Sequence, residues 1–162
     1  MAAKTVIITG ASRGIGYDTA RLFAENGWNV AANYYQTAEP SLALAERFPN
    51  VEAFRADISK REEAYALIRM AIERFGKADV LINNAGIAQQ KLFTDITEEE
   101  WDRMFAVNVK GTMYCCQAVL RDMIRRKSGK IINVSSVWGQ KGASCEVHYS
   151  ASKAAVIGLT KA

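Results

Sequence analysis

A strand pattern, a glycine turn and a helix pattern follow one another at the N-terminus, and this order constrains the fold most. Residues 5–9 form an apolar, largely β-branched run of the kind that makes a buried strand. Residues 14–25 carry apolar side chains at helical spacing, and Asn26-Gly27 would cap their end. Between these two stretches, residues 9–16 read TGASRGIG, with glycines spaced G-x-x-x-G-x-G. Such a sharp passage from strand to helix is typical of the first unit of a parallel sheet.

Strand and helix patterns alternate through the rest of the chain. This alternation predicts an α/β fold, a doubly wound parallel sheet with helices on both faces. With only two prolines, no repeats and no low-complexity tract, residues 1–162 are expected to form one domain. Further strands are expected at 28–33, 51–55, 79–83 and 130–135, and further helices at 41–48, 59–75 and 97–126.

Two of these helices begin with the spacing of a capping box, in which a serine or threonine precedes a glutamate by three residues. Ser59 pairs with Glu62 in this way, and Thr97 pairs with Glu100. The sequence therefore predicts that each hydroxyl caps its own helix.

Composition and charge are those of an ordinary soluble globular protein. Hydrophobic residues make up 49% and charged residues 23% of the chain, which is sufficient for one well-buried core. The net charge is +4, and the densest basic run, residues 121–130, falls at the end of an expected helix, where cations suit the helix dipole. We therefore expect a solvated helix end there and no nucleic-acid site.

The cysteines and the hydropathy indicate neither a metal site nor a membrane protein. Cys115, Cys116 and Cys145 lack the spacing of metal ligands, and the adjacent Cys115 and Cys116 are expected in the core. No apolar run approaches the roughly 20 residues of a membrane span, and the N-terminus reads as a strand rather than a signal peptide. We expect a cytoplasmic protein with reduced thiols.

Tyr149 and Lys153 stand four residues apart, so on a helix they share one face. A free tyrosine, with a pKa of about 10, transfers protons poorly at neutral pH, and a nearby ammonium would favour its phenolate. Ser136 follows a buried-strand pattern, so its hydroxyl would lie at the carboxyl edge of the sheet, where α/β proteins bind ligands. Each feature also has an ordinary explanation: such helical pairs arise by chance, and a serine after a strand usually makes a turn or a cap.

The glycine turn likewise has two interpretations. Glycines let the backbone approach a pyrophosphate, whose charge then meets free N–H groups at a helix N-terminus. Similar turns occur for packing alone. Its place after the first strand of a strand–helix–strand pattern favours a dinucleotide site.

Five motifs occur in order along the chain: TGASRGIG at residues 9–16, NNAG at 83–86, Asn108, Ser136 and YSASK at 149–153. Together they resemble the classical short-chain dehydrogenase/reductase family, most closely its 3-oxoacyl-[acyl-carrier-protein] reductase branch. The resemblance implies a Rossmann-like sheet of strand order 3-2-1-4-5. It also implies further strands and helices after the Tyr-Lys helix, which this sequence lacks.

The same resemblance implies hydride transfer between a nicotinamide and a carbonyl or alcohol carbon. Tyr149 would donate the proton, Ser136 would hydrogen-bond the same oxygen, and Lys153 would lower the tyrosine pKa and grip the nicotinamide ribose. Asn108 would hold a water in the proton relay. The implied cofactor-binding residues are Gly10, Ser12, Arg13, Ile15, Gly16, Asp57, Ile58, Asn83, Asn84, Ala85, Gly86, Tyr149 and Lys153.

Some of these residues have plainer explanations. Asp57 could merely end a strand, and Asn83-Asn84 could be turn residues. Asn108 is the least natural inside an apolar helix without a role. His148, the only histidine, is expected to be a cleft-wall or surface residue and not a base, because consecutive helix positions do not face each other.

The cofactor is expected to be NADP(H) in preference to NAD(H). Family members that prefer NAD place an acidic residue at the end of the second strand, whereas residues 32–37 read ANYYQT. Arg13 is available to a 2′-phosphate. The expected substrate is a small carbonyl compound such as an acyl thioester, and the full-length protein is expected to be a homo-oligomer.

An alternative function is a nucleotide-binding or self-associating fragment without turnover. If the chain ends at Ala162, the fifth strand would be an open sheet edge, and Val156, Ile157 and Leu159 would lose part of their packing surface. We expect weak cofactor binding and negligible turnover in that case.

Overall fold

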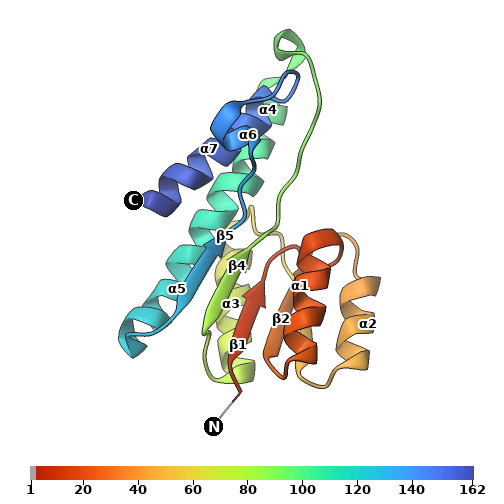
Figure 1. The fold of residues 1–162 in the computed structure, drawn as a ribbon, viewed down its shortest axis with the longest axis vertical. Helices are drawn as coiled ribbons and strands as arrows, with labels where there is room; N and C mark the ends of the chain where they lie inside the picture. The colour runs from red at the N-terminus through yellow and green to blue at the C-terminus, as the bar shows by residue number, and fades with distance from the viewer. Residues whose placement is uncertain (1–2) are drawn as a thin grey trace.

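The computed structural model describes residues 3–162 and contains a five-stranded sheet in which all neighbouring strands are parallel (Figure 1). The strand order is β3-β2-β1-β4-β5, which confirms the expected Rossmann-like α/β fold. The observed strands lie within two residues of the predicted ones. They are β1 (Thr5–Ile8), β2 (Asn29–Tyr34), β3 (Val51–Arg55), β4 (Val80–Asn83) and β5 (Lys130–Asn133).

The helices follow the predicted order, with two short additions that no pattern indicated, η1 and α6. None of the helices within residues 3–162 has the length and apolarity needed to cross a membrane. The helical elements are α1 (Gly14–Glu25), α2 (Glu39–Arg47), α3 (Arg61–Phe75), η1 (Phe93–Asp95), α4 (Glu98–Phe105), the π-helix η2 (Ala106–Gly111), α5 (Thr112–Arg126), α6 (Trp138–Lys141) and α7 (Val147–Lys161).

The inner strands β1, β2 and β4 are buried on both faces, as strands of parallel sheets generally are. The buried strand predicted before Ser136 is wrong, because β5 is the outer strand and Ile132 is 49% exposed. Val6 and Ile8 of β1 pack in the core that contains residues of α1 and α2, while Ile7 packs in the core that contains residues of α3 and α5. Cys115 and Cys116 lie in the second core, as predicted, and burial raises the pKa of the Cys115 thiol to about 12. The two cores hold the strands in register and so fix the carboxyl edge of the sheet.

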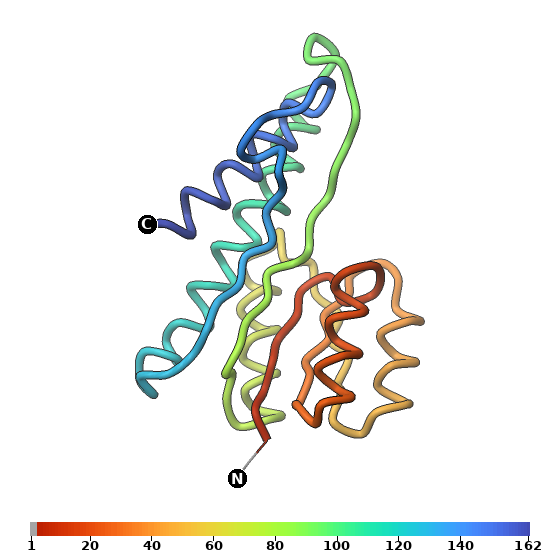
Figure 2. The backbone as a smooth tube through the Cα atoms, in the orientation of Figure 1, coloured from red at the N-terminus to blue at the C-terminus, as the bar shows by residue number. Residues whose placement is uncertain are grey.

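The segments after β4 and β5 leave this edge and extend past it toward α4, α6 and α7 (Figure 2). They meet where the amide of Lys91 donates to the carbonyl of Cys145 at 2.7 Å. α6 packs on α7 so closely that a Cβ at Gly139 would lie 2.7 Å from the carbonyl carbon of Lys153. Among residues 3–162, none after Val134 belongs to either sheet core.

β5 is the outer strand of the sheet in the described residues, as expected. The expectation that Val156 is poorly covered is wrong, because its side chain is only 2% exposed. α7 packs against α6, η2, α4 and β5.

One of the two predicted capping boxes is confirmed. Thr97 Oγ1 accepts from the Glu100 amide at 3.3 Å, and Glu100 Oε2 accepts from the Thr97 amide at 2.9 Å. Both backbone donors at the start of α4 are thus satisfied by side chains.

The capping box predicted for Ser59 and Glu62 is wrong. α3 begins at Arg61, and its N-cap residue makes no side-chain hydrogen bond. The Ser59 hydroxyl instead donates to Asp57 Oδ1 at 2.6 Å. Glu63 rather than Glu62 reaches back, accepting from the Asp57 amide at 2.7 Å. The predicted box fails because the N-cap residue of α3 is Lys60, so Ser59 lies one residue too early to cap the helix.

The long helix expected over residues 97–126 is one run of three segments, with the π-helix η2 between α4 and α5. Such a segment widens the helix locally and often marks a functional site. Asn108 lies within it. At its end, a Cβ at Gly111 would lie 2.7 Å from Ile58 Cδ1, so the helix approaches the loop after β3 closely.

The basic run at residues 121–130 is only partly the solvated helix end that was predicted. The side chain of Arg126 is 22% exposed and donates to Asp122 Oδ2 at 2.7 Å and to the carbonyl of Ala78. The expectation of a solvated cation is wrong for Arg126 because its partners, Asp122 and Ala78, join α5 to the start of β4.

Candidate active site

A cleft of about 500 Å³ lies at the carboxyl edge of the sheet. It brings together the glycine turn, the loop after β3 and the segment after β4. Ile15 and Gly16 do not line it: Ile15 is 70% exposed, and Gly16 packs behind the turn. The predicted cofactor residues that line the cleft are Gly10, Ser12, Arg13, Asp57, Ile58, Asn84, Ala85 and Gly86.

The glycine turn is a close-packed cradle. Gly10 has φ +65°, and a Cβ there would lie 2.8 Å from Ala85 Cα. A Cβ at Gly16 would lie 2.3 Å from the Gly10 carbonyl oxygen and 2.4 Å from Asn84 Nδ2. α1 begins at Gly14 with no side-chain cap, which leaves its first-turn N–H groups for another acceptor. These features fit the pyrophosphate of a dinucleotide.

Asn84 and Thr9 fasten this turn to the end of β4. Asn84 Nδ2 donates to the carbonyls of Thr9 and Gly10, both at 3.0 Å. Thr9 Oγ1 accepts from the amides of Asn84 and Ala85, both at 3.1 Å. Asn84 therefore lines the cleft and, through its side chain, also holds the glycine turn against the end of β4.

Asn33 closes the side of the cleft next to β2. Its buried Oδ1 accepts from the Gly10 amide at 3.3 Å. Its Nδ2 donates to the carbonyls of Tyr34, Phe54 and Ala56 at 3.1 to 3.2 Å. The residues beside it in the lining, Tyr35, Gln36 and Thr37, include no carboxylate.

Asp57 supplies the carboxylate among the residues that line the cleft. Burial raises its pKa, but the hydroxyl and amide of Ser59 and the charge of Arg103 outweigh this effect, so the pKa lies below its ordinary value. Arg103 Nη1 lies 3.8 Å from Asp57 Oδ2 and 3.2 Å from the Ser59 hydroxyl. The cleft therefore presents an anionic acceptor with a guanidinium beside it.

The two serines after β5 have different partners. Ser135 Oγ donates to the carbonyl of Lys153 at 2.8 Å, which fastens the end of the strand to α7. Ser136 Oγ accepts from the Trp138 amide at 3.2 Å. Accepting that bond leaves the hydrogen of the Ser136 hydroxyl for another partner.

Tyr149 and Lys153 share one face of α7, and Lys153 Nζ lies 5.8 Å from the centroid of the Tyr149 ring. Lys153 is 5% exposed, its Nζ donates to the Val134 carbonyl at 2.8 Å, and burial lowers its pKa. A Cβ at Gly86 would lie 3.5 Å from this Nζ. The ammonium thus lies directly behind the wall of the cleft.

Asn108 uses its whole side-chain amide on protein groups. Its Oδ1 accepts from the Ile87 amide, and its Nδ2 donates to the Ile87 carbonyl, both at 2.9 Å. The same Nδ2 donates to the Ser152 hydroxyl at 3.0 Å. The side chain therefore joins the segment after β4 to α7, and a relay water at this position would need a backbone group of Asn108.

The prediction that His148 is a cleft-wall or surface residue is wrong. Its side chain is fully buried, and its Nε2 lies 2.8 Å from Gln89 Oε1. The reason is that the segment after β4 covers the start of α7 at His148. The spacing of Tyr149 and Lys153 defines only the helix face that these two residues share, and His148 lies on another face.

A family profile described as short chain dehydrogenase matches residues 4–162. The chain belongs to this family. It is 42% identical over 162 residues to the 3-oxoacyl-[acyl-carrier-protein] reductase FabG of Staphylococcus epidermidis and 43% identical over 162 residues to that of Staphylococcus aureus. It is 39% identical over 165 residues to the 3-oxoacyl-[acyl-carrier-protein] reductase of Synechocystis.

The chain spans about two thirds of the length of these relatives. The two staphylococcal alignments cover 98% of the chain and 66% of the relative, and the Synechocystis alignment covers 99% and 67%. The resemblance drawn from the five motifs is thus confirmed at the level of the family.

Several residues that shape the cleft were missed from the sequence. Thr9 and Ser135 each stand next to a predicted residue at the end of a strand, and that position was the available signal. Three other missed residues gave no such signal, because their partners come from distant segments. They are Asn33, Gln89 and Arg103.

Proposed function

We propose that this chain carries the cofactor site and the proton-transfer group of an NADP(H)-dependent reductase. The observation behind the proposal is the position of Gly86 in the wall of a glycine-cradled cleft, where an added Cβ would lie 3.5 Å from Nζ of the buried Lys153. A bound nicotinamide would supply or accept the hydride. The protein groups around it would position the substrate and handle the proton.

Tyr149 is the proposed proton donor during reduction of a carbonyl. The Lys153 Nζ lies 5.8 Å from the centroid of the Tyr149 ring, on the same face of α7, so a hydroxyl proton donor and a cation stand side by side there. The spare hydrogen of Ser136 would stabilise the developing charge on the same substrate oxygen.

NADP(H) is the proposed cofactor, since Arg13 lines the cleft and residues 35–37 contribute no carboxylate that would repel a 2′-phosphate. The proposed substrate is a 3-oxoacyl thioester, by analogy with the reactions that the names of the relatives describe. A cytoplasmic homo-oligomer is the proposed setting for the whole protein.

The direct test is replacement of Tyr149 by phenylalanine, which keeps the ring and removes the proton. In the full-length protein, we expect oxidation of NADPH with 3-oxoacyl thioesters to fall by about 10² to 10⁴, while NADPH affinity measured by fluorescence titration stays within about twofold. Tyr65→Phe is the matched control: it makes the same chemical change on α3, where the hydroxyl donates to Gln117, and should leave turnover unchanged. Activity retained in Tyr149→Phe would assign the acid to another residue.

A further inference from the structure

His148 and the segment that covers it form a polar chain that the proposed reaction does not use. His148 is fully buried and directly precedes Tyr149 in α7. Its Nε2 lies 2.8 Å from Gln89 Oε1, and its Nδ1 has no hydrogen-bond partner within residues 3–162. Burying a polar atom without a partner costs free energy, so the one bond that this imidazole makes has to offset that cost.

Which atom donates in the bond between His148 and Gln89 follows from the bond between Gln89 and Glu100. Gln89 Nε2 donates to Glu100 Oε1 at 2.8 Å. The hydrogen bond from Lys91 holds the pKa of Glu100 at about 2, so its carboxylate can only accept. The amide oxygen of Gln89 therefore faces His148, and His148 Nε2 must carry a hydrogen, whatever the state of Nδ1.

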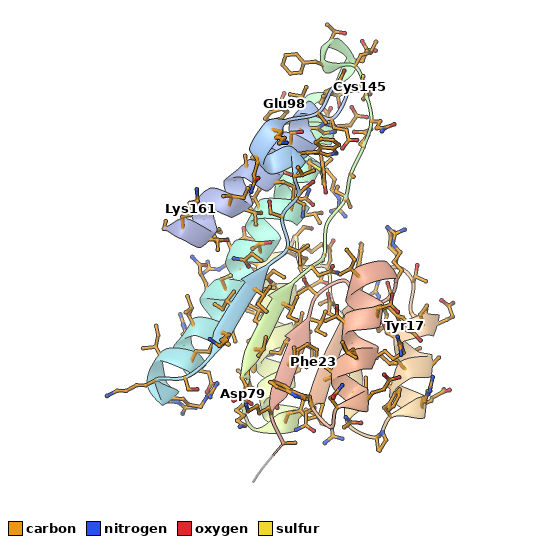
Figure 3. All side chains as sticks on the ribbon, in the orientation of Figure 1. Tyr17, Phe23, Asp79, Glu98, Cys145 and Lys161 are labelled. Carbon is orange, nitrogen blue, oxygen red and sulfur yellow. The ribbon has the colours of Figure 1, made fainter. Side chains whose placement is uncertain are left out.

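The chain of bonds joins three parts of the molecule. Glu100 belongs to the capping box of α4, Gln89 lies in the segment after β4, and His148 lies in the first turn of α7. The same segment is fastened again where Gln90 Nε2 donates to Glu146 Oε1 at 3.2 Å. These contacts lie beyond the carboxyl edge of the sheet, at the end of the molecule where Figure 3 labels Glu98 and Cys145.

The position of this segment matters at the cleft. Gly86 and Ile87 line the cleft, and they also contact Lys153 and Asn108 respectively. We propose that His148 is a positioning residue: through Gln89 and Glu100 it holds the segment 84–97 at a fixed distance from α7. It thereby sets how a bound cofactor lies against Tyr149. The effect on the cofactor rests on the proposed function, whereas the hydrogen bond between His148 and Gln89 does not depend on it.

Two substitutions at residue 148 separate the hydrogen bond from the space that the ring fills. In His148→Gln, the side-chain N–H stands three bonds from Cβ, as Nε2–H does in histidine, so the donor can reach Gln89. In His148→Asn, the donor stands one bond short. Gln89→Met removes the acceptor while it keeps the length of the side chain.

The experiment uses the 162-residue chain and two measurements that need no turnover: hydrogen exchange of peptides that cover residues 84–97, and fluorescence titration with NADPH. We expect His148→Asn to raise exchange in this segment about fivefold and to weaken NADPH binding about threefold. His148→Gln should stay within about twofold of the unmodified chain. The double variant His148→Asn with Gln89→Met should be no worse than Gln89→Met alone, because Gln89→Met already removes the bond to His148 together with the bond to Glu100.

The matched control is Asn50→Ala, which removes donations to the carbonyls of Ala24 and Trp28 on the far side of the sheet. It should lower the overall stability and leave exchange in residues 84–97 unchanged relative to the rest. The proposal is overturned if His148→Gln is as impaired as His148→Asn, if the two single effects add, or if Asn50→Ala loosens the segment equally. Failure of the unmodified chain to bind NADPH would overturn the proposed function instead, and the exchange measurements would still decide the role of His148.

Discussion

Arg13 is the single residue from which we expect the largest effect on cofactor choice. It lines the cleft and is the N-cap residue of α1, yet its side chain makes no capping bond and remains available to a ligand. An arginine can bind a phosphate through two parallel hydrogen bonds.

We predict that Arg13→Gln weakens NADPH binding about tenfold or more and changes NADH binding by less than about twofold. Titration of both cofactors against both proteins measures this directly. Equal losses for the two cofactors would show that Arg13 contacts a group that they share, and the proposed preference for NADP(H) would lose its basis.

We predict that replacement by alanine changes the stability of the chain in opposite directions at two glycines. A Cβ at Gly16 would lie 2.3 Å from the carbonyl oxygen of Gly10, so Gly16→Ala should destabilise the chain by about 1 to 3 kcal/mol. A Cβ at Gly158, in α7, has nothing within 4 Å, so Gly158→Ala should stabilise it by about 0.5 to 1 kcal/mol. Urea unfolding of both variants tests the pair, and a stable Gly16→Ala chain would contradict the close packing of the cradle.

At the scale of elements, the start of α4 is held by one carboxylate. The hydrogen bond from Lys91, followed by those from the Thr97 amide and Gln89, lowers the pKa of Glu100 to about 2 from an ordinary 4.5. A carboxyl whose pKa is lower in the folded chain stabilises the fold above the unfolded pKa. That stabilisation is lost as the pH falls toward the folded pKa.

We therefore predict that Glu100→Gln lowers the urea midpoint at about pH 6 and that the difference from the unmodified chain disappears between about pH 4.5 and pH 2. Glu98→Gln is the control, since Glu98 shares the first turn and the helix dipole but not these three bonds. Parallel pH profiles for the Glu100 variant and the unmodified chain would contradict the assignment.

The elements of the sheet could be predicted from the sequence because their signal is local. The apolar runs around Ile7 and Leu81 are long enough to identify a parallel strand without knowledge of its neighbours. In the structure both residues are fully buried. The glycine turn and the Tyr149–Lys153 spacing are similarly short-range. These patterns therefore located the strands, the turn and one face of α7.

What could not be predicted depends on contacts and local geometry that an apolar pattern does not describe. Ser59 has the spacing of a helix cap, but Asp57 takes its hydroxyl. His148 is buried because residues near Gln89 fold over α7. The π-helix around Asn108 covers only Ala106–Gly111, too few residues to show as a separate pattern, so the long helix was expected to be regular. Of these three differences, only the burial of His148 depends on a segment far away in the sequence.

At the scale of the whole molecule, the proposed catalytic residues sit on a part that the two sheet cores do not contain. The cores end at Val134, whereas α7 is held by Val156 and by hydrogen bonds such as those of Ser135 and Lys153. Segments with fewer buried apolar contacts open locally before the rest unfolds.

We predict that the amides of α7 exchange with solvent at least about tenfold faster than those of β1 and β4 under native conditions. Residue-resolved hydrogen exchange measures both sets in one experiment. Equal protection in α7 and the central strands would show that the molecule opens as a single unit.

Asn33 determines which changes of cofactor preference are open to this scaffold. Its amide nitrogen satisfies three carbonyl oxygens where β2 and β3 end, and its oxygen satisfies the Gly10 amide. A carboxylate at residue 33 would face those three carbonyls without a hydrogen to offer, so this position cannot become acidic without loosening the strand ends. Descendants of this sequence that turned to a cofactor without a 2′-phosphate would have to place their acidic residue further along the chain, among the cleft residues 35–37.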